Sequence, residues 1–137
     1  MTSCQKIAPG ATAYAGQQGF SYFEGIARES VGAQGICMHL LTIPPGGRAQ
    51  AHKHATHETA IYVLSGVTEM AWGERLEHRM TVAAGEMLYI PADMPHLPWN
   101  PGPEPATALI ARTDPREQES VVLLPELEAL LDQVPAA

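Results

Sequence analysis

The stretch HKHATHE, residues 52–58, decides the fold, because it places three histidines and a glutamate within seven positions. Side chains of an extended strand alternate between its two sides, so His52 and His54 point to the same side. Neutral imidazole is a common metal ligand and suits zinc, copper, iron and nickel. A further histidine, His96, follows Pro95 far along the chain. Two imidazoles on one side of a strand, with a third from a neighbouring strand, predict a divalent-metal site on a β-scaffold.

On both sides of this stretch the chain is divided into short segments rich in β-forming residues. Glycine and proline number 12 each and separate these segments at close intervals. Short strands between regularly spaced turns are typical of an all-β sandwich or barrel. We therefore expect strands at residues 35–43, 59–64, 67–72, 75–82, 86–90, 95–99 and 106–112.

Two glycine-bounded motifs surround the histidines. The first runs Gly46, five residues, His52, Lys53, His54, three residues, Glu58, seven residues, Gly66. The second runs Gly85, five residues, Pro91, Ala92, Asp93, two residues, His96, three residues, Asn100. In this order, and 18 residues apart, they resemble the two motifs of the cupin superfamily, G-x5-H-x-H-x3–4-E-x6-G and G-x5-P-x-G-x2-H-x3-N.

The resemblance implies a small single-domain cupin with a double-stranded β-helix (jelly-roll) barrel over about residues 35–113. It also implies that the motif histidines His52, His54 and His96 bind a metal inside the barrel. We expect a divalent transition metal, either iron, manganese, nickel or zinc, because imidazole-rich sites accept several first-row ions. Asp93 stands where the family has glycine. Because aspartate adopts the left-handed backbone region with modest strain, we expect the turn to be retained.

The fourth ligand is open between two neighbours, His57 and Glu58. Counting back from Gly66, the family's glutamate falls on Thr59, because seven residues rather than six separate Glu58 from Gly66. Alternate residues share one side of a strand, so if Val63 faces the barrel interior, His57 does too and Glu58 faces out. A bulge would reverse this assignment. We predict His57 as the fourth ligand and keep Glu58 as the alternative.

The C-terminal residues 123–134 carry leucines at helical spacing, among them Leu124 and Leu127. Pro125 is tolerated as a first helical residue, and Glu126 suits the positive end of the helix dipole. We expect a short helix that packs on its own barrel or, alternatively, on a second subunit. Since exposed edge strands are normally covered or paired, and since the resemblance implies frequent dimers, we also expect a homodimer.

Composition limits the cellular setting and the partners. A net charge of -7, from eight basic and fifteen acidic residues, argues against nucleic acid or an anionic membrane surface as partner. No apolar stretch approaches the roughly 18 residues that cross a bilayer, and the N-terminus lacks the apolar core of a signal peptide. We expect a cytoplasmic protein of one domain, residues 1–137, with a poorly ordered lead-in at 1–18.

A metal held by three or four ligands leaves coordination positions open, which is typical of a catalytic centre. We therefore expect a metal-dependent enzyme of oxygenase or isomerase type, acting on a small molecule in the barrel. The alternative is a binding protein that uses the metal to hold or sense a ligand without turnover. The catalytic acid or base is unassigned; Glu58, if it is not a ligand, is the first candidate and His39 the next. A phosphosugar is disfavoured, because only Arg48 and Arg112 are plausible phosphate partners.

Overall fold

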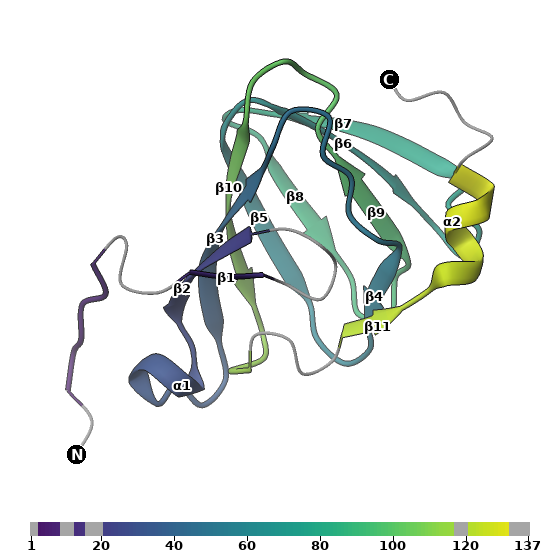
Figure 1. Cartoon of the computed structure of the whole chain (residues 1–137). Coiled ribbons are helices and arrows are strands. Elements are labelled where there is room, and N and C mark those ends of the chain that lie inside the picture. Colours follow the sequence, from purple (N-terminus) through teal and green to yellow (C-terminus); the bar gives the residue numbers. More distant parts are fainter. Residues whose placement is uncertain (1–2, 9–12, 16–20, 117–120, 132–137) are drawn as a thin grey trace.

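A computed structural model describes residues 3–8, 13–15, 21–116 and 121–131. For residues 13–15, 21–24 and 131 it describes the backbone alone. Its strands form two antiparallel sheets that face each other (Figure 1). The first sheet has six strands in the order β1 (Ala13–Ala15), β2 (Ser21–Ile26), β3 (Cys37–Ile43), β10 (Ala106–Arg112), β5 (Thr59–Ser65), β8 (Met87–Ile90). The second has five, in the order β11 (Val121–Leu123), β4 (His52–His54), β9 (His96–Trp99), β6 (Val67–Trp72), β7 (His78–Ala83).

Between β3 and β10 the chain passes repeatedly from one sheet to the other, which is the connectivity of a jelly-roll barrel. A short helix, α2 (Pro125–Leu131), follows at the C-terminal end of the described chain. The prediction of an all-β jelly-roll barrel with a short C-terminal helix is therefore confirmed. Strands β1, β2 and β11 and the helix α1 (Arg28–Val31) were not predicted.

The interior of the barrel is set by strict alternation along two neighbouring central strands, β3 and β10. In β3 and β10 every second residue is buried, and Ala108 lies opposite Leu41 while Ile110 lies opposite His39. The inward side chains near one end of these strands are aliphatic, and Leu41, Ile43, Ala106 and Ile110 belong to one buried cluster. Arg112 ends β10 at the other end and is also buried.

The turn at Asp93 keeps the conformation that the family's glycine would take. Asp93 has a φ of 65°, in the left-handed region, and its N–H donates to the carbonyl of His54 over 2.8 Å. The aspartate therefore preserves the turn that leads into the strand of His96, as expected. At Gly66, where φ is 81°, a Cβ would lie 2.9 Å from the backbone of Ala106, so the motif glycine is required by space as well as by conformation.

The hairpin between β6 and β7 is longer than predicted. The sequence indicated a turn at Gly73 and Glu74 with a strand from residue 75, whereas β7 begins at His78. The reason is Leu76, which adopts a φ of 53° and is buried with Leu97 and Trp99 on the outer side of the second sheet. Burial of this leucine takes the chain out of an extended conformation before the strand can begin.

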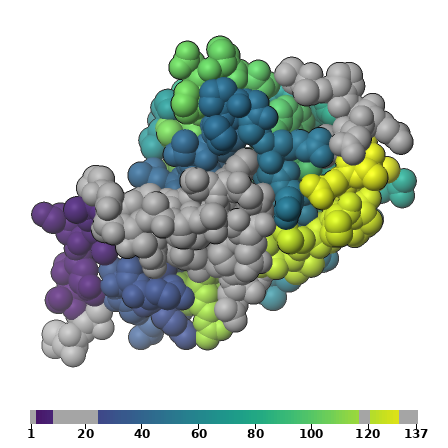
Figure 2. Space-filling view, viewed as in Figure 1, coloured from purple at the N-terminus to yellow at the C-terminus, as the bar shows by residue number. Residues whose placement is uncertain are grey.

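Helix α2 covers the outer side of the second sheet. Leu124 and Leu127 pack against the buried cluster that contains Leu97 and Trp99. The yellow C-terminal segment lies along one side of the molecule in Figure 2. Of the two alternatives for this tail, the structure shows the helix packed on its own barrel; residues 132–134 of the predicted helix lie outside the described residues. Neither α2 nor any other described helix is long and apolar enough to cross a membrane.

Candidate metal centre

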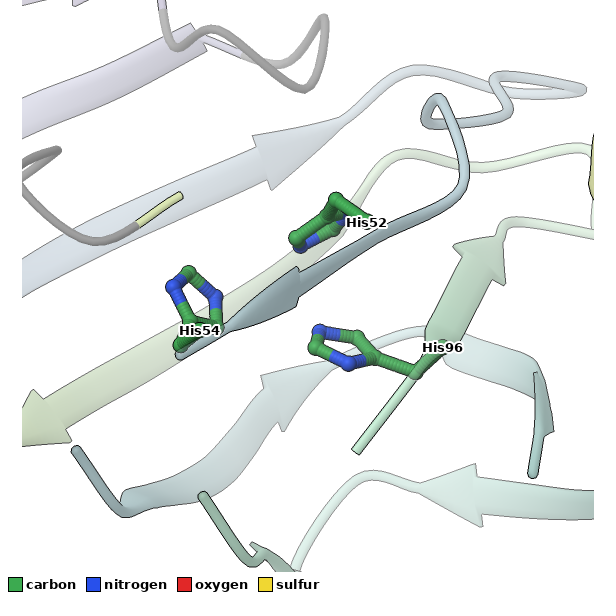
Figure 3. A group of neighbouring side chains, drawn as sticks. All are labelled: His52, His54 and His96. Atoms are coloured by element: carbon green, nitrogen blue, oxygen red, sulfur yellow. The ribbon is translucent and has the colours of Figure 1, made fainter. Parts of the chain in front are cut away.

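Three of the predicted ligands converge between two adjacent strands. His52 on β4 lies directly opposite His96 on β9, and His54 lies on the same side of β4 as His52. One ring nitrogen from each of His52, His54 and His96 lies within 4.8 Å of the others, and all three side chains are buried. Figure 3 shows the three rings directed toward one another from these two strands. The strand alternation predicted for His52 and His54 thus creates a group of donors that can hold a metal ion.

Backbone carbonyls orient two of these imidazoles. The Nδ1 atom of His52 lies 2.8 Å from the carbonyl oxygen of Gln50, and Nδ1 of His96 lies 2.9 Å from that of Met94. A neutral ring that donates from Nδ1 leaves Nε2 as the lone-pair donor, which is the usual arrangement of a metal-binding histidine. His54 differs, because neither of its buried ring nitrogens has a hydrogen-bond partner among the described residues. Buried polar atoms are rarely left unsatisfied, so the nitrogen of His54 that carries the lone pair is suited to a bound ion.

Burial also keeps the three imidazoles neutral. Desolvation lowers the pKa of His96 from 6.5 to about 4, and it lowers the pKa values of His52 and His54 well below the ordinary value. The positive charge of Arg112 lowers all three pKa values further. Since a metal ion binds the deprotonated form of histidine, the three donors are ready for a cation at neutral pH.

A cavity of about 50 Å³ adjoins the histidines inside the barrel. Both sheets line it, with the polar side chains of His52, His96, Arg112 and Thr59 gathered at one end of the strands. The remaining walls are almost entirely apolar; they comprise Leu41, Ile43, Ile61, Val63, Met70, Leu88, Ile90, Pro98, Ala108 and Ile110, with Thr68 as the exception. The cavity therefore presents the histidine group to a small and largely apolar space.

Arg112 is a buried cation that lines this cavity, whereas its sequence position indicated only a plausible phosphate partner. Its side chain is 4% exposed, and its Nη1 lies 3.2 Å from Nε2 of His39. Burial, with Arg112 as a second cause, lowers the pKa of His39 from 6.5 to about 3, so His39 accepts the hydrogen bond as a neutral ring. The signal for Arg112 was present in the segment ATALIAR, where Arg112 shares its parity with Ala106, Ala108 and Ile110.

The two candidates for the fourth ligand point in opposite directions. His57 is buried, its ring centroid lies 4.7 Å from that of His54, and its Nδ1 lies 3.3 Å from a carboxylate oxygen of Asp114. Glu58 is exposed and accepts a hydrogen bond of 2.6 Å from the hydroxyl of Tyr89. The group of three mutually close donors does not include His57, so its role as fourth ligand stays a prediction. Asp114 was missed by the sequence analysis, since nothing local to it indicates a histidine partner.

Fold and site together define a class of protein: a jelly-roll barrel with a three-histidine group suited to a metal ion in its interior. A family model described as the cupin domain matches residues 39–112, which is more than half of the chain. The chain belongs to the cupin family, as the two motifs indicated.

The relatives agree with this assignment. Germin-like protein 1-1 of Oryza sativa subsp. japonica is 31% identical over 108 residues, which cover 77% of this chain and 50% of that protein. The chain thus spans half the length of this curated relative. In fold, it is similar to the oxalate decarboxylase of Lactobacillus farciminis in its formate complex, with a TM-score of 0.71 and 20% identity over 90% of this chain and 38% of that one. An oxalate oxidase in complex with the substrate analogue glycolate gives a TM-score of 0.67 with 19% identity, over 90% of this chain and 70% of that one.

Proposed function

We propose that this cupin is a metal-dependent enzyme of oxygenase type that acts on a small molecule inside the barrel. One observation supports the proposal: the donor atoms of three buried histidines, His52, His54 and His96, lie within 4.8 Å of one another beside a cavity in the barrel. Three imidazoles leave coordination positions of a transition-metal ion open to a ligand. A divalent ion held there would supply Lewis-acid activation of a bound substrate or, in the case of iron, oxygen chemistry.

The residues around the cavity favour an oxygenase over an isomerase. Isomerisation by proton transfer needs a general acid or base within reach of the substrate. Within the described part of the chain, the titratable side chains that line the cavity are His52, His96 and Arg112, of which the first two are the proposed ligands. Glu58, which the sequence offered as an acid or base, is exposed and bonded to Tyr89 on the outside of the barrel. Chemistry centred on the metal needs no such group.

A binding protein is the second candidate, and the same observation supports it. The described residues of the cavity lining include no proton-transfer group beyond the proposed ligands, and such a cavity is also suited to holding a ligand on the metal without turnover. The protein side chains would then do no more than bind, orient and exclude water.

The test uses protein purified without a histidine tag. Elemental analysis identifies the ion, and oxygen uptake is then followed with a panel of small organic acids, aldehydes and alcohols. We expect uptake that disappears when the ion is removed and in the His54→Ala variant. An ion with bound ligand but without uptake or product supports the binding protein instead. Protein that binds no transition metal at all overturns both candidates.

We also propose a homodimer, formed through the outer side of the first sheet. Helix α2 does not serve for this contact in the described chain, because Leu124 and Leu127 pack on the barrel itself. The outer side of the first sheet carries the exposed apolar side chains of Met38, Met87 and Tyr89. Light scattering of the wild type and of Met87→Lys tests the proposal, and a monomeric mass for the wild type would reject it.

A further inference from the structure

Arg112 has a feature that the proposed metal chemistry does not use. It is a buried cation that lines the cavity, and its Nε atom has no hydrogen-bond partner among the described residues. Guanidinium groups carry five donors in a planar fork that matches the geometry of a carboxylate. Buried polar groups are normally satisfied, so the unused donor points to a ligand that is itself an acceptor.

The hydrogen bond to His39 does not compensate the positive charge of Arg112. His39 accepts from Nη1 over 3.2 Å as a neutral ring, and among the described side chains no aspartate or glutamate forms an ion pair with Arg112. Of the residues that the structure describes, no aspartate or glutamate lines the cavity either. A buried charge without an opposite charge is strongly unfavourable, which makes an anionic ligand the natural partner of this cavity.

We propose that Arg112 binds the carboxylate of a small monocarboxylic acid whose aliphatic part lies against the apolar walls of the cavity. Those walls include Leu41, Val63, Met70 and Ala108, and they offer no partner for a second carboxylate. The inference rests on the proposed function in placing a small molecule in the barrel, but it does not depend on the metal.

Size and charge define the ligand further. A cavity of about 50 Å³ holds about four water-sized groups, which corresponds to an acid with a few carbon atoms. A phosphate carries close to two negative charges and needs several donors, whereas the described residues place one cationic side chain, Arg112, in the cavity lining. The small volume of the cavity and the single charge of Arg112 together favour a short aliphatic carboxylate over a phosphorylated compound.

The experiment titrates propionate and its neutral isostere propionamide into metal-free 15N-labelled protein. Binding is followed by NMR through the backbone amide resonances of cavity-lining residues such as Val63 and Ile110, and in the wild type also through the Nε–H resonance of Arg112. We expect propionate to bind at least about tenfold more tightly than propionamide, because a hydrogen bond to a charged group contributes more than one to a neutral group. Arg112→Met should remove this preference, while the matched control Arg75→Met, which removes an exposed arginine, should retain it. If Arg112→Met does not fold, the comparison of the two ligands in the wild type still decides the question.

Equal binding of propionate and propionamide by the wild type overturns the inference. Tighter binding of oxalate or inorganic phosphate than of propionate also overturns it, because the cavity would then select a different class of anion. A parallel titration with zinc separates the two proposals. Zinc binding without a propionate preference supports the metal centre and rejects the carboxylate site. A propionate preference without zinc binding supports the carboxylate site and rejects the metal centre.

Discussion

The two ends of the barrel interior are built by the same strands but differ in the polarity of their side chains and in the effect that burial has on them. Strand β10 passes from Ala106 and Ala108, which pack among aliphatic side chains, to Arg112, which lies near the histidines. At the apolar end burial removes hydrocarbon from water, which stabilises the fold. At the polar end burial acts on ionisable groups, and it lowers the pKa values of His39, His52 and His96. One alternating strand pattern therefore provides both a core and a site, and substitutions at the two ends should have separable effects.

The largest expected effect is the loss of the metal from the polar end. His54→Ala removes one of the three converging donors, and we expect affinity for the ion to fall by more than about 100-fold, since even residues that only orient ligands change affinity by about 10- to 100-fold. Elemental analysis after dialysis measures the change. The matched control is His78→Ala, because His78 is exposed and stacks on Trp72 outside the cluster. A His54→Ala protein that retains its ion would show that the three-histidine group is not the metal centre.

Substitutions at the apolar end should lower the stability of the fold and leave metal affinity unchanged. Leu41 is 5% exposed within the aliphatic cluster, and Leu41→Ala should lower the free energy of unfolding by about 2–5 kcal/mol through lost burial and a residual cavity. Urea denaturation of the metal-free protein measures this loss. Leu64→Ala is the control, since Leu64 is 47% exposed and its truncation should change stability by at most about 0.5 kcal/mol. Comparable losses for the two variants would mean that the aliphatic cluster does not provide the core.

Low pH should destabilise the metal-free protein, because the buried histidines at the polar end resist protonation in the folded state. The pKa of His96 is lowered to about 4 in the folded state against 6.5 in the unfolded chain, mainly by burial. Between these values the unfolded state binds a proton that the folded state does not, so stability is complete above pH 6.5 and falls as the pH drops toward 4. For His96 alone the loss by pH 5 is about 2 kcal/mol. Thermal unfolding of metal-free protein across this range measures the effect, and a melting temperature that stays constant from pH 7 to pH 5 would contradict it.

The two candidates for the fourth ligand provide a finer test of the polar end. His57 is buried beside His54 and bonded to Asp114, whereas Glu58 faces outward to Tyr89. We expect His57→Gln to weaken metal binding about tenfold or more, and Glu58→Gln to leave it within about twofold. Competition with a coloured chelator gives both affinities. The opposite result, with Glu58→Gln as the weaker binder, would assign the fourth position to Glu58 and would require the strand to bulge in the loaded protein.

Comparison of these residues shows what could be predicted from the sequence and what could not. His52 and His54 share a side through alternation along β4. His57 has the parity of Val63, so its inward direction follows from extending the alternation of β5 back to residue 57. The contact of Arg112 with His39 joins residues 73 positions apart and depends on the pairing of β10 with β3, which local patterns do not reveal. The pair of His57 and Asp114 is of the same kind. Leu76 was misplaced because its burial under α2 overrides the hairpin pattern around it.

The smallest expected effect concerns the outward side of the strand that carries the ligands. Lys53 lies between His52 and His54 but points away from them, and its Nζ lies 2.8 Å from a carboxylate oxygen of Asp93. With side chains 28% and 65% exposed, this ion pair should contribute less than about 1 kcal/mol, so Lys53→Met should lower stability slightly and leave metal affinity within about twofold.

Asp93→Gly breaks the same ion pair but also relieves the modest strain of an aspartate in the left-handed backbone region. Its net effect on urea denaturation should therefore be close to zero or stabilising, in contrast to Lys53→Met. A loss of metal in Lys53→Met would mean that the outer side of β4 helps to position His52 and His54, and a loss in Asp93→Gly would mean that the turn before β9 positions His96.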